Sequence, residues 1–258
     1  MQIAHILPVN MISEEMPRQN IEMYLTHKVL EHPEVFKFLA KDKENGIETF
    51  KILDNSACEL GKGMDFDLVL KAARIIGANE IVLPDIPRSG KSACRTLKYW
   101  IDLPDEIKQQ YNIAAVCQGE NRQQLLQCAE QLISLPINTI MLPKWYCSMD
   151  SENGLGRYDL TLEILKIIDR LGRTDCEIHW LGCDTGLREL VSPISNFVRS
   201  VDTGYFTALS TPQWKQLHVS EDRPRDLKID LEQMPVDLTR WQELTKAVEN
   251  VVQDVVEV

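Results

Sequence analysis

Acidic and amide side chains follow several short apolar runs of this sequence, at the point where each run ends. Asp54 ends FKILD, Asp85 ends EIVLPD, Asp202 ends FVRSVD, and Gln118 and Gly119 follow IAAVC. A single aspartate after a strand is usually a turn residue or a helix cap. Neighbouring carboxylates repel one another and raise each other's pKa, so a protein selected only for stability tends to avoid them. If the run ends converge, these residues predict a functional site.

Several carboxylates and one amide suit a particular kind of chemistry. Two carboxylates serve substitution at the anomeric carbon of a sugar, because one attacks or stabilises the oxocarbenium-like centre while the other moves protons. A third carboxylate could accept from the N1–H and N2–H₂ groups of guanine, and an amide or main-chain N–H could donate to its O6 and N7. The residue types therefore favour chemistry on a sugar that carries a base.

The elements that would position these residues alternate along the chain. Runs rich in Ile, Val and Leu, which predict strands apolar on both faces, lie at 2–8, 50–54, 80–85, 113–119, 138–144, 177–182 and 197–202. Between them, apolar residues at spacings of three and four predict helices at 64–77, 121–135 and 157–172, and a last helix is expected at 237–257.

Seven strand–helix units in about 200 residues predict an α/β protein of the (β/α)8 TIM-barrel type. We expect one domain over 1–258 without a zinc subdomain. Its C-terminal helix is expected either to close the barrel or to contact a partner. An eighth strand is not evident, so the segment 206–230 is expected to form an irregular last unit. In such a barrel the carboxyl ends of all strands meet at one mouth, which brings the acidic residues together.

Composition narrows the class of protein. The net charge of −11 argues against nonspecific coating of nucleic acid, but it allows a local basic rim, for which Lys144, Arg157 and Arg199 are the candidates. The alternative is that these three side chains are solvated charges on helix faces.

No apolar run is long enough to span a membrane, and no signal peptide is evident. Seven scattered cysteines without a C-x-x-C pair predict reduced thiols, a cytoplasmic location and no zinc motif.

Five motifs in order, LDNSACELG, VLPDIP, VCQGE, IHWLGC and VRSVDTG, span roughly residues 50 to 210. Together they resemble the tRNA-guanine transglycosylase superfamily, and most closely the phage-type enzymes that place 7-deazaguanine bases in DNA. The resemblance implies that Asp202 is the nucleophile and Asp54 the general acid/base. The residues that it implies for base binding are Asp85, Gln118, Gly119 and Gly182.

The sequence departs from the tRNA-modifying members of this superfamily in a way that favours DNA over tRNA as the substrate. The tRNA enzymes carry a cysteine-rich zinc site after the nucleophile, whereas here no cysteine follows Cys183. The implied activity is that of a pentosyltransferase without a cofactor, which exchanges guanine in DNA for a free 7-deazaguanine through a covalent aspartyl-glycosyl intermediate. The implied location is the cytoplasm, of the host cell if the protein is viral. A helper protein that opens the duplex and a homodimer are compatible with this hypothesis.

Three alternatives remain open at this point. The first is a queuosine-type transglycosylase that acts on tRNA. The second is a non-catalytic subunit that binds nucleic acid. The third is an unrelated barrel lyase or hydrolase, such as a sugar-processing hydrolase or an aldolase, whose reactive lysine would be Lys144. For His179, which lies within an apolar run, we expect a buried, hydrogen-bonded ring and not a metal ligand.

Overall fold

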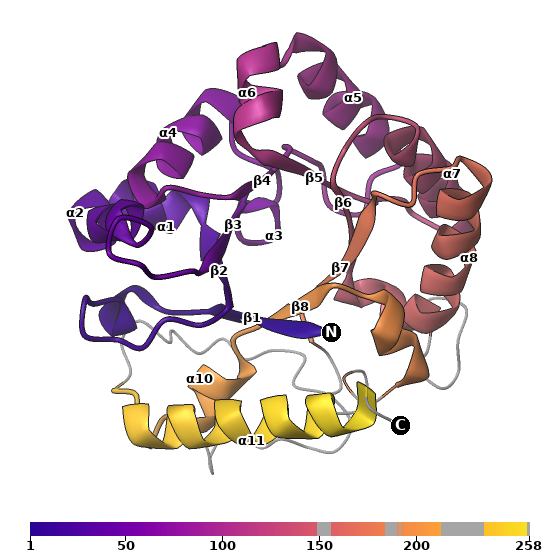
Figure 1. Ribbon diagram of the computed structural model, residues 1–258. Coiled ribbons are helices and arrows are strands. Elements are labelled where there is room, and N and C mark those ends of the chain that lie inside the picture. The colour runs from indigo at the N-terminus through magenta and orange to yellow at the C-terminus, as the bar shows by residue number, and fades with distance from the viewer. Residues whose placement is uncertain (149–155, 184–189, 191, 213–234, 257–258) are drawn as a thin grey trace.

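Eight parallel strands form a closed barrel in the computed structural model, with helices around the outside (Figure 1). The structure describes residues 1–148, 156–183, 190, 192–212 and 235–256. The strands are β1 (Gln2–Ile6), β2 (Ile21–Leu25), β3 (Phe50–Asp54), β4 (Glu80–Val82), β5 (Asn112–Val116), β6 (Thr139–Pro143), β7 (Glu177–Leu181) and β8 (Ser200–Thr203). The predicted TIM barrel is confirmed.

Alternate residues of each strand face the barrel interior. Because successive side chains of a strand point to opposite faces, Phe50, Ile52 and Asp54 share one face of β3. Ile52 belongs to a cluster that fills the barrel, with Ala4, Ile21, Met23, Val82, Ala114, Val116 and Met141. The other face of each strand contributes to a larger cluster with the surrounding helices, and Leu53 is one of its buried members. A strand-end residue of the interior face therefore points into the mouth.

The helices follow the spacing of apolar residues. In α4 (Phe66–Ile76), Val69, Ala73 and Ile76 lie on one buried face, and Gly77 ends the helix with a φ of 61°. The other α-helices are α1 (Thr26–Glu31), α2 (Pro33–Phe36), α3 (Ala57–Leu60), α5 (Ser92–Asp102), α6 (Asp105–Gln110), α7 (Arg122–Ile133), α8 (Gly156–Arg170), α10 (Tyr205–Leu209) and α11 (Leu238–Val256). The 3₁₀ turns are η1 (Val9–Met11), η2 (Lys37–Lys41), η3 (Lys144–Ser148) and η4 (Pro193–Phe197).

The eighth strand, which was not evident in the sequence, is β2, and it lies between β1 and β3. The sequence IEMYL hides the strand because Glu22 interrupts its apolar run. Glu22 is nevertheless fully buried, since Arg18 pairs with it at 2.8 Å. Of the segment 206–230, the structure describes 206–212, and 213–230 lie outside the described residues.

The C-terminal helix is confirmed, but it does not close the barrel. Closure comes from β1 and β8, which pair from Gln2 with Ser200 to His5 with Thr203. Helix α11 lies outside the barrel beside β1 (Figure 1), where the buried Trp241 ring meets His5 edge-on at a centroid distance of 5.1 Å. Among the helices in the described part of the chain, none is long and apolar enough to cross a membrane.

An ion pair lies inside the barrel at the end where the strands begin. Arg199 donates from Nη1 and Nη2 to the two carboxylate oxygens of Glu80, both at 2.8 Å. Nη1 also contacts Thr139 Oγ1 at 3.0 Å and Glu177 Oε2 at 3.2 Å. The guanidinium lies over the Phe50 ring, 5.3 Å from its centroid. This arrangement satisfies the Glu80 carboxylate, which has no exposure to solvent.

Candidate active site

Asp54 ends β3 on the face that points into the barrel, and the protein leaves it only 9% exposed. Its Oδ2 accepts a hydrogen bond from the Ser56 amide at 2.7 Å, and its main-chain carbonyl accepts one from Thr26 Oγ1 at 2.6 Å. The carboxyl group is thus held from the turn that follows β3, and the main chain of Asp54 is held from the start of α1.

Burial and three other carboxylates raise the pKa of Asp54 well above its ordinary value. Loss of solvent is the largest cause, the charge of Glu59 comes next, and Asp85 and Asp202 add to it. A raised pKa keeps the proton on Asp54 and lets it act as an acid. Glu59 was not predicted from the sequence. It lies in α3, where loss of solvent raises its pKa and the charge of Asp202 adds to the effect.

A strained turn joins β3 to α3. Ser56 has a φ of 61°, in the left-handed region that residues other than glycine rarely adopt, yet it is fully buried. His27 holds it, because the His27 amide donates to Ser56 Oγ at 3.2 Å and His27 Nδ1 lies 2.8 Å from the same oxygen. Backbone strain of this kind persists where surrounding contacts enforce it, often at functional sites. Here it directs the Ser56 amide at Asp54.

Asp202 lies on β8 and is held by two nitrogen donors. The Gly182 amide donates to Asp202 Oδ1 at 2.9 Å, and His179 Nε2 lies 3.1 Å from the same oxygen. A carboxylate only accepts, so His179 carries its proton on Nε2, and Nδ1 accepts from Ser200 Oγ at 2.7 Å. Burial lowers the pKa of His179, with the contact to Asp202 opposing that shift. The prediction of a buried, hydrogen-bonded histidine is confirmed.

Asp85, which follows β4, lies in a hydrogen-bond network of side-chain amides. Asn55 Nδ2 donates to Asp85 Oδ1 at 2.9 Å, and Gln118 Nε2 donates to Oδ2 at 2.6 Å. Burial nevertheless raises the pKa of Asp85 to about 6. Gln118 Oε1 in turn accepts from the Arg88 amide at 2.9 Å. Both Asp85 oxygens therefore already accept from protein amides.

Gly119 is tied to the loop after β6. Its amide donates to the Tyr146 hydroxyl at 2.8 Å, and that hydroxyl donates to the Gly119 carbonyl at 2.9 Å. A side chain at position 119 would place its Cβ 2.5 Å from the main-chain nitrogen of Leu125, so the close approach of α7 requires glycine. Gly119 thus fixes the loop that follows β5.

The three cations that we predicted to bind phosphate do not form one surface. Lys144 is exposed at the end of β6. Arg157 is 1% exposed and donates to three carbonyls at the ends of β6 and β7, those of Leu142, Leu181 and Gly182. Arg199 lies at the opposite end of the barrel. The predicted phosphate contacts of Arg157 and Arg199 are therefore corrected, since both guanidinium groups bind the protein itself.

Sequence reasoning found the strand-end residues and missed their supports. Asp54 and Asp202 lie at the ends of β3 and β8, and Asp85 and Gln118 follow β4 and β5. The contacts of Asn55, His27 and Ser56 carry no local sequence signal. Within the described residues, no group of three His, Cys, Asp or Glu side chains is arranged to hold a metal ion.

Comparisons with known proteins give no support to the resemblance. No protein-family model and no curated protein matches the chain. Among solved structures, an HpcH/HpaI aldolase from Desulfitobacterium hafniense DCB-2 matches with a TM-score of 0.48 and 9% identity, over 78% of this chain and 85% of that one. An HpcH/HpaI aldolase/citrate lyase family protein from Burkholderia cenocepacia J2315 matches with a TM-score of 0.45 and 9% identity, over 71% and 78%.

These findings correct the predicted family and activity. No family model and no curated protein supports the assignments to the tRNA-guanine transglycosylase superfamily, to a pentosyltransferase and to exchange of guanine for 7-deazaguanine, and these predictions are corrected. The physical reason is that an aspartate or a Leu-Gly pair suits the turn that follows a strand in any (β/α)8 barrel. Such residues therefore do not identify one family. At 9% identity the likeness concerns the barrel alone, so an activity has to be argued from the site.

Proposed function

We propose that this barrel is a hydrolase that cleaves a glycosidic or similar acetal-type bond in a small polar substrate. The observation that carries the proposal is the presence at the mouth of two interior carboxyl groups in different environments. Asp54 has a pKa raised by burial and by neighbouring charge, whereas Asp202 accepts from two nitrogen donors. Carboxyl groups whose environments differ in this way divide the roles of acid and base.

In the proposed reaction, Asp54 gives its proton to the leaving oxygen as the bond to carbon breaks. Asp202 either takes the proton of the water that attacks that carbon, or attacks the carbon itself to form an ester, which water then hydrolyses while Asp54, now deprotonated, takes the proton of that water. His179 and the Gly182 amide orient Asp202 and are positioning groups, because they contact its Oδ1 and leave Oδ2 for the reaction. The exposed Lys144 beside Gly182 is available to an anionic group of the substrate.

The test is turnover of a panel of nitrophenyl glycosides by the purified chain. Asp54→Asn and Asp202→Asn should each lower kcat by about 100-fold or more, whereas Asp102→Asn, an exposed carboxylate at the end of α5, should leave it unchanged. Product formed in ¹⁸O-labelled water should carry the label if the enzyme is a hydrolase. Retention of full activity by Asp202→Asn would contradict the assignment.

A Schiff-base lyase is the second candidate, and the position of Lys144 favours it. The lysine lies at a strand end in the mouth, and its Cδ lies 2.8 Å from where a Cβ on Gly182 would stand. Its positive charge reaches Cys58 on α3. Borohydride reduction with pyruvate should then add a fixed mass to Lys144, and Lys144→Arg should abolish the adduct. An unmodified protein would exclude this mechanism for that substrate.

A further inference from the structure

A buried arginine lies at the turn after β7, which also supports Asp202. Arg157 belongs to the first turn of α8 and is 1% exposed. Its guanidinium lies over the Trp180 ring, 5.0 Å from the ring centroid. Trp180 Nε1 donates to Thr161 Oγ1 at 3.0 Å, and this hydroxyl donates to the Arg157 carbonyl at 2.8 Å. The cation is therefore fixed between α8 and β7.

One peptide unit joins this cation to the carboxylate of Asp202. The Leu181 carbonyl accepts from Arg157 Nη1 at 2.9 Å. The Gly182 amide, which belongs to the same trans peptide, donates to Asp202 Oδ1 at 2.9 Å. The two groups point in opposite directions from one plane, so the guanidinium meets the negative end of the peptide dipole and the carboxylate meets its positive end. Hydrogen bonds to charged groups such as these are shorter and stronger than bonds between neutral groups.

The same guanidinium sets the conformation at Gly182. Arg157 Nη2 donates to the Gly182 carbonyl at 2.9 Å, so the carbonyls on both sides of the Gly182 Cα bind one planar group. Nη1 also donates to the Leu142 carbonyl of β6 at 3.3 Å, which ties the turn to the neighbouring strand. A guanidinium presents its donors in a rigid fork, so these contacts restrain the backbone of Gly182 at its φ of 71°. The direction of the Gly182 N–H is fixed in consequence.

The electrostatic effect of the cation extends to the carboxylate. Asp202 is 5% exposed, so little water screens its charge. Hydrogen bonds in series polarise one another in such surroundings, and a cation at the carbonyl therefore makes the amide a stronger donor. We infer that Arg157 is a positioning residue, which holds Oδ1 of Asp202 through the Leu181–Gly182 peptide and leaves Oδ2 to the substrate. The use of Asp202 in catalysis rests on the proposed function, whereas the contacts do not.

Hydrogen exchange of glycine amides tests this inference without a substrate. The full chain labelled with ¹⁵N-glycine contains 12 labelled residues, and the NMR signal that Gly182→Ala removes identifies Gly182. Arg157→Met should accelerate exchange of the Gly182 amide by about tenfold or more, because it weakens a charge-assisted hydrogen bond. The Gly119 amide, which donates to the Tyr146 hydroxyl after β5, should exchange as in wild type.

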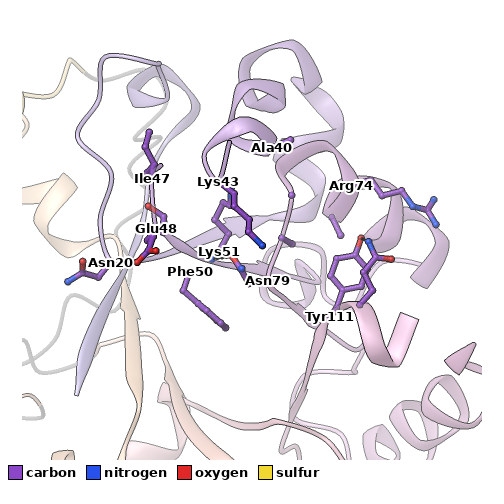
Figure 2. Close-up of a pocket in the computed structure, with 15 residues that line it drawn as sticks. Asn20, Ala40, Lys43, Ile47, Glu48, Phe50, Lys51, Arg74, Asn79 and Tyr111 are labelled. Carbon is purple, nitrogen blue, oxygen red and sulfur yellow. Dashed lines mark hydrogen bonds between the residues drawn. The ribbon is translucent and has the colours of Figure 1, made fainter. Parts of the chain in front are cut away.

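Two further variants separate this role from the loss of any buried cation. Arg157→Lys keeps the charge without the planar fork, so exchange of Gly182 should fall between wild type and Arg157→Met. Lys51→Met removes a buried cation at the opposite end of the barrel, where Figure 2 shows Lys51 among the residues that line a cavity. This variant should leave exchange of Gly182 unchanged.

Coupling between Arg157 and Asp202 gives the decisive result. In an Asp202→Asn background, Arg157→Met should accelerate exchange of Gly182 by less than about threefold, because the amide has already lost its charged acceptor. The inference is overturned if Arg157→Met leaves exchange of Gly182 as in wild type, or if Gly119 accelerates by the same factor. It is also overturned if the effect persists in full in the Asp202→Asn background.

Kinetics separate this inference from the proposed function. If the chain hydrolyses a glycoside, Arg157→Met should lower kcat by about tenfold and change KM by less than about twofold, because the orientation of Asp202 matters most in the transition state. An unchanged kcat in that variant would contradict the positioning role. If no glycoside is hydrolysed but the exchange results hold, the proposed function fails while the support of Asp202 by Arg157 stands.

Discussion

Replacement of Arg199 by methionine should destabilise the protein strongly. The change leaves the Glu80 carboxylate fully buried, with Thr139 Oγ1 at 2.7 Å as its remaining side-chain partner among the described residues. Removing one partner of a buried ion pair costs about 3–5 kcal/mol, because the other charge stays in a medium of low polarity. That is a large part of the roughly 5–15 kcal/mol by which a domain is usually stable.

A double-mutant cycle tests this reasoning through the free energy of unfolding in urea. Glu80→Met alone should cost less than Arg199→Met, since Glu177 at 3.2 Å still faces the Arg199 guanidinium. The double variant places two apolar chains beside Phe50 and should recover at least about 2 kcal/mol relative to the sum of the single changes.

The matched control is Arg170→Met. Arg170 pairs with Glu130 at 2.9 Å, but their side chains are 57% and 48% exposed, so the pair should contribute less than about 1 kcal/mol. If Arg199→Met costs no more than this control, or if the two single changes simply add, the ion pair is not the element that stabilises this end of the barrel.

Two further predictions concern the active-site end. Burial raises the pKa of Asp85 from 3.8 to about 6, so the folded state binds its proton more tightly than the unfolded state, and this residue lowers stability as pH rises from about 4 to 6. The stability of Asp85→Asn relative to wild type should accordingly rise by about 2 kcal/mol between pH 4 and 7 in urea titrations; a constant difference would contradict the shift. Gly182→Ala should cost about 1–2 kcal/mol, because its φ is 71°, and should lower activity by misplacing the amide that holds Asp202. Gly172→Ala, with a φ of 65° and open space around it, should cost stability alone, and equal losses of activity would refute the role of the Gly182 amide.

The barrel could be predicted because seven of its strands lie in short runs rich in Ile, Val, Leu and other apolar residues. Buried parallel strands need side chains that tolerate burial on both faces, and that requirement is visible in the sequence. β2 escaped because its outward face carries Glu22, whose partner Arg18 comes from the preceding loop. A charged residue within a run is read as solvent-exposed unless the partner that neutralises it is known.

The same limit applies to the site. Positions at strand ends identified Asp54 and Asp202, since barrel geometry alone brings such ends together. Their supports depend on contacts across the chain, such as that of His27 with Ser56, which are 29 residues apart. The direction of Arg157 could not be foreseen either, because an arginine after a loop has the same sequence pattern whether it faces solvent or main-chain carbonyls. Motif order without these contacts was too general to identify a family.

Pairing of the first strand with the last gives this protein a particular order of assembly during synthesis. One edge of β1 can form hydrogen bonds with β2 as soon as both have left the ribosome, but its other edge pairs with residues 200–203. The nascent chain therefore carries an open sheet with two unpaired edges through most of its translation. Contacts so distant in sequence form slowly, and unpaired edges invite association with other chains. Chaperone dependence should therefore be greatest for chains truncated before β8 and should fall once that strand is present.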